Sequence, residues 1–388
     1  MKILHVISSL NPEEGGPVEN VKQYCVNYKL YNIEGEILCS DGPKDKWIKS
    51  QKLPKIYALG PVHFKYSFNP KLYQWLKLNV KNYDFVIVNG IWQFHSIAVR
   101  NICKKQNIPF FLFTHGMLDP YFNKDIIKYI KKYIYWYLFE NKVLRDAKRV
   151  IFTTEIEKKL AKKSFFPYKC NGISIGYGIK GMPRQIGSVS KDFLKKYNLK
   201  KNKYLLYFGR FHKKKGIDLL IKSFSNVLKY NNKLILVLAG PKNDFYENKL
   251  SKIIKQNKIE KNVIVTGALY GSLKWQVIKN CFVLCLTSHS ENFGIVIAEA
   301  LSCSKPVFIT KKVNLYKSII KYKSGFVCED NFKSINNKLK KIINLDKKKY
   351  KFYSAQAKKC FDDNFEIKKP LLNLLKIIKK YKNKKINF

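Results

Sequence analysis

The sequence is short of acidic residues. Its 388 residues include 75 Lys and Arg but only 27 Asp and Glu, which gives a formal net charge of +48. Such an excess favours an anionic partner, either nucleic acid or a membrane surface. An RNP aromatic pattern and zinc-finger spacing are both missing, so we expect no nucleic-acid partner. Lys, Asn, Ile, Phe and Tyr are abundant together, and the charge also fits the composition of an AT-rich genome.

Long apolar runs and paired cysteine motifs are also absent. Because no run of eighteen apolar residues occurs, we expect no membrane-spanning helix. The apolar start Met1–Leu10 leads into Gly15-Gly16-Pro17 without a small-residue cleavage site, which predicts a first strand rather than a signal peptide. The nine cysteines form no CxxC pair. Several lie inside apolar runs, where a free thiol behaves as a small hydrophobic side chain, and this predicts a reduced, cytoplasmic protein.

The chain does contain a regular alternation of short apolar strands and helical segments. Its length suits two domains, each with its own core. The fold class expected is α/β, with two Rossmann-like parallel-sheet domains that face a central cleft, over residues 1–186 and 187–365. Residues 172–187 are rich in glycine and predict the linker. The predicted strands are residues 2–7, 84–88, 109–114, 150–154, 204–208, 234–239, 263–266, 282–286 and 306–310.

Two carboxylates, Glu291 and Glu299, follow one of these strands. Residues 295–301 favour a helix, so Glu291 falls in a loop at the carboxyl edge of a parallel sheet, where ligands of such sheets bind. If Glu291 were helical, the pair would span about 12 Å along the axis, which suits a ligand with two separated hydroxyl groups better than one metal ion. The structural alternative is a first-turn Glu near the helix dipole and a second Glu on a solvated face.

Arg210 and Lys215 occupy a second loop of this kind, in the stretch GRFHKKKGIDLL after strand 204–208. An Arg fork and a Lys point charge together suit a pyrophosphate. The alternative is a solvated basic loop, which is our interpretation of Lys213 and Lys214. The glycine break at Gly216 makes Lys215 the better candidate.

Two loops in the N-terminal half are further candidates. Gly16 opens a predicted helix after the first strand, where backbone N–H groups can approach a phosphate, although GxGxxG is absent. His115 follows strand 109–114 in a loop shaped by glycine and proline. That placement indicates function, whereas a lone histidine elsewhere is more often structural.

Residues Lys124–Arg149 have helical periodicity, with aromatic residues and isoleucines on one side and lysines on the other. This pattern predicts a helix that packs on a sheet while its lysines reach solvent. A secondary role is contact with an anionic membrane surface.

Together these motifs resemble the family 4 retaining glycosyltransferases of the GT-B fold. The matching stretches are Gly15-Gly16, THGMLDPYF, GRFHKKKGIDLLI, LVLAGP and ENFGIVIAEALSCSKPV, in the order of the family and over nearly the whole chain. THGMLDP and YGSLKW resemble bacterial enzymes of surface-polysaccharide synthesis. The resemblance implies transfer of a hexose from a nucleotide-diphosphate sugar to a saccharide or lipid-linked acceptor at the inner face of the cytoplasmic membrane. Residues 366–388 would form a C-terminal helix that returns to the N-terminal domain.

The resemblance also implies a role for each candidate residue. Arg210 and Lys215 would hold the diphosphate, Glu291 would contact the donor sugar, and His115 would help to stabilise the transition state. Because Arg and Lys neutralise the leaving group, and no Asp-x-Asp triplet is present, no metal or other cofactor is expected. The residues expected to bind the donor through the backbone or, for the last, through the ribose are Gly16, Asn292, Phe293, Gly294, Ile295 and Glu299.

Two other classes of protein share the expected fold. A nicotinamide dehydrogenase would need a GxGxxG motif with a later acidic residue for the ribose, and neither is present. A non-catalytic nucleotide-sugar-binding or membrane-adaptor protein would keep the fold and lose the charged pairs. The joint presence of Arg210, Lys215, Glu291 and Glu299 argues against it.

Overall fold

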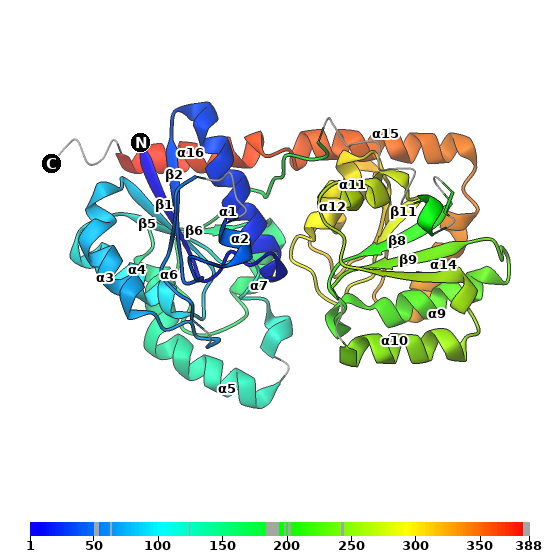
Figure 1. The fold of residues 1–388 in the computed structure, drawn as a ribbon, viewed down its shortest axis with the longest axis horizontal. Helices are drawn as coiled ribbons and strands as arrows, with labels where there is room; N and C mark the ends of the chain where they lie inside the picture. Colours follow the sequence, from blue (N-terminus) through cyan, green and yellow to red (C-terminus); the bar gives the residue numbers. More distant parts are fainter. Residues whose placement is uncertain are drawn as a thin grey trace. The chain divides into compact units, whose positions relative to one another are not determined.

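The computed structural model describes residues 1–49, 54–62, 64–123, 125–183, 194–197, 199–200, 203–241 and 244–382. It divides the chain into two compact units. The first is Met1–Gly178 together with Ile367–Phe388, and the second is Ile179–Glu366. The predicted boundary after residue 186 lies outside the described residues. In each unit, helices cover both faces of a sheet (Figure 1).

The sheet of the first unit has seven parallel strands in the order β3-β2-β1-β4-β5-β6-β7. The strands are β1 (Lys2–Ile7), β2 (Glu34–Cys39), β3 (Ile56–Ala58), β4 (Phe85–Asn89), β5 (Phe110–Phe113), β6 (Arg149–Phe152) and β7 (Gly172–Ser174). β2, β3 and β7 were not predicted. β7 corrects the start of the predicted linker, because Gly172–Ser174 pairs with β6 instead. Two of these strands have three residues each, too few to show a period of two.

Two hydrophobic clusters enclose this sheet. Helices α1 (Gly16–Asn27) and α16 (Lys368–Lys382) contribute to one of them, together with β1 side chains such as Ile3. The other contains residues of α3 (Pro70–Asn79), α4 (Phe94–Lys105), α6 (Asn141–Asp146) and α7 (Glu155–Ala161). The C-terminal helix α16 is therefore part of the first unit.

The segment predicted as one helix over Lys124–Arg149 is interrupted. It consists of α5 (Ile126–Tyr135), a π-helical turn (Trp136–Glu140) and α6, while Arg149 belongs to β6 and Lys124 lies outside the described residues. Tyr129, Tyr133 and Trp136 pack against the core. The isoleucines do not pack against the core, since Ile126, Ile127, Ile130 and Ile134 are 52–66% exposed. The predicted separation of apolar and basic sides holds, because the aromatic rings and the isoleucines lie on adjacent stripes of the helix opposite the lysines. The prediction that the apolar side packs is wrong for the isoleucines, since only the aromatic stripe contacts the core.

The sheet of the second unit has six parallel strands in the order β10-β9-β8-β11-β12-β13. They are β8 (Tyr204–Phe208), β9 (Ile235–Ala239), β10 (Val263–Gly267), β11 (Val283–Leu286), β12 (Val307–Thr310) and β13 (Gly325–Cys328). All but β13 were predicted. Two parallel-sheet α/β units confirm the predicted fold class. The strand order turns between β8 and β11, and ligands of open α/β sheets bind at the carboxyl ends of the strands at such a switch point.

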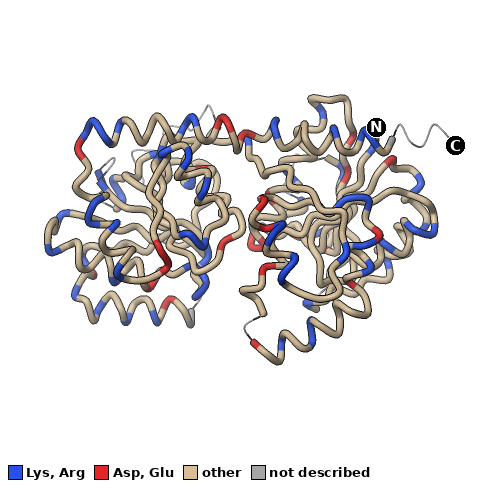
Figure 2. Tube along the Cα trace, turned by 180° about the vertical axis from the view of Figure 1, so that it is seen from behind, with Lys and Arg blue, Asp and Glu red and all other residues tan. Residues whose placement is uncertain are grey.

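Helices cover both faces of the second sheet as well (Figure 1). On one face α9 (Ile217–Leu228) packs with α10 (Asp244–Gln256) and α14 (Phe332–Ile343). On the other, α12 (Ile295–Ser302) packs with α11 (Gly271–Asn280) and α15 (Lys347–Asn364). Within the described ranges, no helix is long and apolar enough to cross a membrane. Lysine and arginine are spread over the helices and loops of both units (Figure 2).

Candidate active site

The loop after β8 is fixed against the end of β11 by a glycine. Gly216 has φ +60°, and a Cβ at this position would lie 2.2 Å from the carbonyl oxygen of Thr287. The Thr287 hydroxyl also donates to the Gly216 carbonyl oxygen over 2.9 Å. Only glycine permits this approach, which holds Lys215 beside the carboxyl end of β11.

The same loop also contacts the strand on its other side. A Cβ on Gly240, which follows β9, would lie 1.9 Å from the carbonyl oxygen of Gly209. Arg210 comes next and is exposed, while its carbonyl oxygen accepts a hydrogen bond from the Tyr207 hydroxyl over 2.8 Å. The backbone around Arg210 is thus fixed and its guanidinium faces solvent.

Lys215 and Glu291 form an ion pair across the switch point, through Nζ and Oε2. Their side chains are 20% and 14% exposed. Burial by itself raises the pKa of the Glu291 carboxyl, but the positive charges of Lys215, Lys214 and Arg210 outweigh it and hold the pKa below its usual value. The predicted residues Arg210, Lys215 and Glu291 are therefore brought together, and Glu291 is ionised among cations.

Glu291 is not helical, so the 12 Å spacing considered for the two carboxylates does not apply. Its backbone forms an isolated parallel bridge with Val313, and its carbonyl oxygen accepts from the Asn314 N–H over 2.9 Å. The left-handed Gly294, with φ +68°, separates it from α12, which begins at Ile295. Glu291 thus lies in the loop, as the sequence predicted.

The residues between Glu291 and α12 are anchored on both sides. The Asn292 Oδ1 atom accepts a hydrogen bond from the Asn314 side chain over 3.2 Å. Phe293 is buried, with its ring 5.5 Å from that of Phe365. Together they fix the turn at Gly294 and the first N–H groups of α12, where a helix favours an anion.

Glu299 lies in the second turn of α12 and pairs with Lys274 of α11. The Glu299 side chain is 5% exposed, whereas Lys274 is 26% exposed. The sequence did not identify Lys274 as a site residue. Nothing in its local pattern separates it from the many other lysines, because the ion pair depends on how α11 packs beside α12.

The remaining candidates belong to the first unit. Gly16 begins α1, directly after Gly15 with φ +76°. Its carbonyl oxygen accepts a hydrogen bond from the Tyr177 hydroxyl over 2.8 Å. The backbone that would approach a phosphate is therefore held by a side chain far away in sequence.

His115 adopts a left-handed conformation with φ +50° at the end of β5. Its ring stacks on Phe113 at 5.4 Å, and its Nε2 atom lies 3.4 Å from Oδ1 of Asn89, the last residue of β4. Burial lowers the pKa of His115 to about 3. The imidazole is therefore neutral near pH 7. Asn89 is a further residue that the sequence did not identify.

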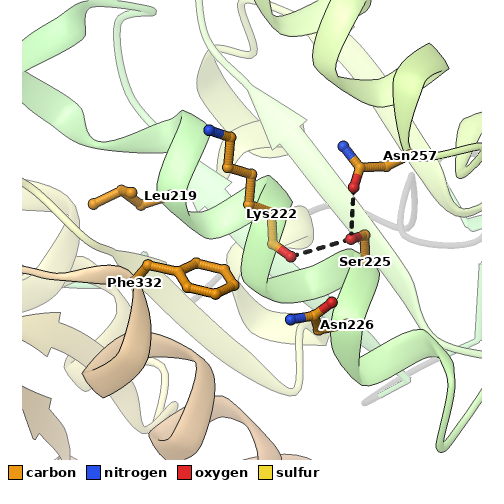
Figure 3. A pocket seen from close by; sticks show the side chains of 6 residues that line it. All are labelled: Leu219, Lys222, Ser225, Asn226, Asn257 and Phe332. Carbon is orange, nitrogen blue, oxygen red and sulfur yellow. Dashed lines mark hydrogen bonds between the residues drawn. The ribbon is translucent and has the colours of Figure 1, made fainter.

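A surface pocket of the second unit lies elsewhere (Figure 3). It is lined by Leu219, Lys222, Ser225, Asn226, Asn257 and Phe332. Ser225 donates from its hydroxyl to the Lys222 carbonyl oxygen over 3.1 Å and to Asn257 Oδ1 over 3.0 Å. None of the candidate residues is among those that line it. No group of three His, Cys, Asp or Glu side chains that could hold a metal ion occurs among the described residues.

Comparisons with known proteins find similarity to glycosyltransferases. Residues 189–359 match the family model "Glycosyl transferases group 1". Alpha-1,3/1,6-mannosyltransferase ALG2 of Dictyostelium discoideum is 25% identical over 268 residues, and the match spans 63% of this chain and 63% of ALG2. The capsular polysaccharide biosynthesis glycosyltransferase CapM of Staphylococcus aureus is 27% identical over 222 residues, or 55% of this chain and 57% of CapM.

The fold also matches that of solved glycosyltransferase structures. HepE of Anabaena, crystallised with UDP and glucose, superposes with a TM-score of 0.77 at 17% identity. The superposition covers 98% of this chain and 100% of HepE. Sucrose-phosphate synthase of Thermosynechococcus elongatus superposes with a TM-score of 0.78 at 16% identity, covering 98% of both chains.

Proposed function

We propose that this chain, a relative of the group 1 glycosyltransferases, transfers a hexose from a nucleotide-diphosphate sugar to a saccharide or lipid-linked saccharide acceptor with retention of configuration. Its strongest support is the Lys215–Glu291 ion pair at the switch point of the second sheet, beside Arg210. Relatives named as mannosyl and capsular-polysaccharide transferases, and a structural neighbour that binds UDP and glucose, support the same class of reaction.

In this proposal the cations act on the leaving group. The bond between the anomeric carbon and the diphosphate oxygen breaks, and the acceptor hydroxyl attacks on the face that the diphosphate leaves. The proton of that hydroxyl passes to the departing diphosphate oxygen. Arg210 and Lys215 stabilise the charge that develops on the diphosphate, so neither a metal nor another cofactor is required. Glu291 accepts from hydroxyls of the sugar, and Glu299 accepts from those of the ribose. The roles expected for Gly16 and His115 remain predictions.

A panel of nucleotide sugars tests this function. We expect slow hydrolysis of one or two donors by the purified protein, faster transfer once an acceptor is supplied, and activity in the presence of EDTA. UDP-glucose belongs in the panel because HepE binds UDP and glucose. Binding of a nucleotide sugar without hydrolysis or transfer would favour the alternative, a non-catalytic nucleotide-sugar-binding or adaptor protein.

A titration with UDP and GDP should distinguish the roles of Glu291 and Glu299. Glu299→Gln should weaken binding of the free nucleoside diphosphate roughly tenfold, because a charge-assisted hydrogen bond is worth about 1.5–3 kcal/mol. Glu291→Gln should leave this affinity nearly intact and lower transfer, since Glu291 is assigned to the sugar. Calorimetry measures both affinities. Equal losses in the two variants would contradict this division of roles.

We further propose that the protein works in the cytoplasm, peripherally attached to the inner face of the membrane through α5. Ile126, Ile127, Ile130 and Ile134 are exposed, and Lys128 and Lys131 lie on the same helix facing solvent. An exposed apolar stripe with adjacent lysines suits an anionic bilayer surface. Lys132 is not part of this surface, because it is half-buried between Trp92 and Phe122, at 5.1 Å and 5.5 Å from their ring centres.

Co-sedimentation with anionic vesicles tests this surface. Lys128/Lys131→Glu should abolish most binding at low salt, since each lysine near an anionic bilayer contributes about 1 kcal/mol. Ile130/Ile134→Gln should weaken vesicle binding at both low and high salt, because it removes apolar contact with the bilayer and leaves the charge attraction unchanged. Lys348/Lys351→Glu, on exposed positions of α15, is the charge-matched control and should bind like the wild type. If the control loses as much binding as Lys128/Lys131→Glu, the net charge rather than α5 holds the protein at the membrane.

A further inference from the structure

The Glu157 carboxylate accepts hydrogen bonds from the residues on both sides of His115. Glu157 lies in the first turn of α7, whose N-cap Thr154 accepts from the Glu157 N–H, and its side chain is buried. Its Oε1 atom accepts from the Thr114 hydroxyl over 2.7 Å and from the Gly116 N–H over 2.6 Å. Thr114 and Gly116 are the two neighbours of His115, so this oxygen closes the turn in which His115 takes its left-handed conformation.

The second oxygen of Glu157 fixes the carboxylate itself. Oε2 accepts from the Thr153 N–H over 2.7 Å and from the Thr153 hydroxyl over 2.6 Å. Thr153 follows β6, and His115 follows the neighbouring β5. Four donors therefore converge on one buried carboxylate, which is the full acceptor capacity of its two oxygens. The His115 turn is tied to the end of the adjacent strand and not only to its own loop.

The Asn89 side chain contacts the ring of His115, and its hydrogen bonds determine which side of the amide carries the oxygen and which the nitrogen. Its Nδ2 atom lies 3.1 Å from the Ile87 carbonyl oxygen and 3.3 Å from the Val6 carbonyl oxygen. Carbonyl oxygens only accept, so the nitrogen must be on that side. The Oδ1 atom then faces Nε2 of His115, and the ring nitrogen must supply the hydrogen.

A buried chain of polar groups supports this orientation of Asn89. Its Nδ2 atom is also 3.2 Å from Nδ1 of His5, so its two hydrogens are shared among three acceptors. Because Nδ2 cannot accept, the hydrogen of the His5 ring lies on Nε2, which donates to the Tyr28 hydroxyl over 2.8 Å. His5 and Tyr28 are fully buried, and burial lowers the pKa of His5 to about 3, so the His5 ring is neutral as this arrangement requires. Both histidine rings therefore have defined tautomers.

We propose that Glu157 and Asn89 are positioning residues for His115, with Glu157 fixing its backbone and Asn89 fixing its ring as the Nε2–H tautomer. The inference rests on the proposed function, in which His115 is expected to help stabilise the transition state of transfer. In the Nε2–H tautomer, Nδ1 of His115 carries no hydrogen and can only accept a hydrogen bond. A sugar hydroxyl can donate to it. Because Glu157 and Asn89 hold the His115 ring in one orientation before the substrate binds, their loss should lower the rate of the chemical step.

Glu157→Gln is the direct test of the backbone contact. In either orientation the new amide NH₂ meets a backbone N–H, of Gly116 or of Thr153, so one of these hydrogen bonds is lost and two donors face each other. We expect kcat to fall about tenfold or more with the donor KM changed less than about twofold. Glu155→Gln, at an exposed position in the same turn of α7, is the matched control and should change neither.

Histidine ring ¹⁵N spectra give a readout that needs no activity. In the wild type, His115, assigned with His115→Gln, should show Nε2 as the protonated nitrogen and Nδ1 as the bare one. Asn89→Leu should convert this to a mixture of tautomers, and Glu157→Gln should shift the His115 signals while Glu155→Gln leaves them in place. If Glu157→Gln does not fold, Thr114→Val removes one of the four hydrogen bonds and takes its place.

The outcomes separate the two proposals. If His115 shows the Nδ1–H tautomer, or if Asn89→Leu and Glu157→Gln leave both the spectrum and kcat unchanged, the positioning roles are overturned. If the spectra behave as expected but no donor is turned over by the wild type, the positioning of His115 stands and the glycosyltransferase function fails.

Discussion

Replacing Lys215 by Ala is expected to lower the transfer rate at least about tenfold, and Arg210→Ala similarly, because each removes a charge-assisted contact to the leaving diphosphate worth about 1.5–3 kcal/mol. Lys215→Ala has a second effect. It leaves the Glu291 carboxylate, 14% exposed, without the cation that forms its ion pair. Steady-state rates with a saturating donor measure both losses, and Lys213→Ala, an exposed neighbour in the same loop, is the control.

The pH dependence distinguishes the two variants. The charge of Lys215 is the largest of the effects that lower the pKa of Glu291, and burial acts in the opposite direction. Without Lys215 this pKa should rise, so activity should be lost at a higher pH on the acid side than in the wild type. Arg210→Ala should move the acid limb less. Rates of both variants within twofold of the wild type would reject the diphosphate assignment.

Mild acid should destabilise the first unit through three histidines, because burial lowers the pKa of His115 to about 3 and acts in the same way on His5 and His95. His5 and His95 are 0% and 1% exposed, and burial lowers their pKa values from 6.5 to about 3 and about 4. Because the unfolded chain binds these protons more tightly, stability is fully present above pH 6.5 and is lost as the pH falls toward the folded values. Each histidine removes up to about 1.4 kcal/mol per pH unit below pH 6.5, or about 5 kcal/mol for the three between pH 6.5 and 5.

Glu140 opposes this loss in the same unit. Burial raises the pKa of its carboxyl to about 7, so the folded state takes up a proton below that pH and regains about 2 kcal/mol over the same interval. The net loss should therefore be about 3 kcal/mol in the wild type and about 5 kcal/mol in Glu140→Gln, which cannot titrate. Chemical denaturation at pH 6.5 and 5 measures the difference. Equal losses in the two proteins would show that Glu140 does not titrate in this range.

The sequence predicted the strands that can be identified from their own residues. Wholly apolar runs such as Leu205–Tyr207 and Leu284–Leu286 identify buried parallel strands, and a polar cluster directly after them identifies the carboxyl edge. Among the strands that escaped prediction, β2 contains the polar residues Glu34 and Glu36, and β3 and β7 have three residues each. β13 escaped although it is as long as the predicted β11 and β12. The fold class was therefore predictable while the full strand list was not.

The candidate site divides in the same way. Lys215 and Glu291 could be predicted because both follow strands, although the sequence could not show that β8 and β11 are neighbours. Lys274, Asn89 and Glu157 were missed because their partners are 25, 26 and 41 to 43 residues away and depend on helix packing or strand order. The neighbouring residues in the sequence do not distinguish these three from the other lysines, asparagines and glutamates of the chain.

The glycines around the loop after β8 also limit how this chain can drift. A lysine-rich, asparagine-rich composition can spread over surface positions because most of them tolerate any polar side chain. Gly216 and Gly240 admit no side chain at all, since a Cβ would lie within 2.2 Å of a backbone oxygen at both. Polar substitutions on the exterior of the second unit should therefore be tolerated, whereas a side chain at Gly216 or Gly240 would displace the backbone of the loop after β8.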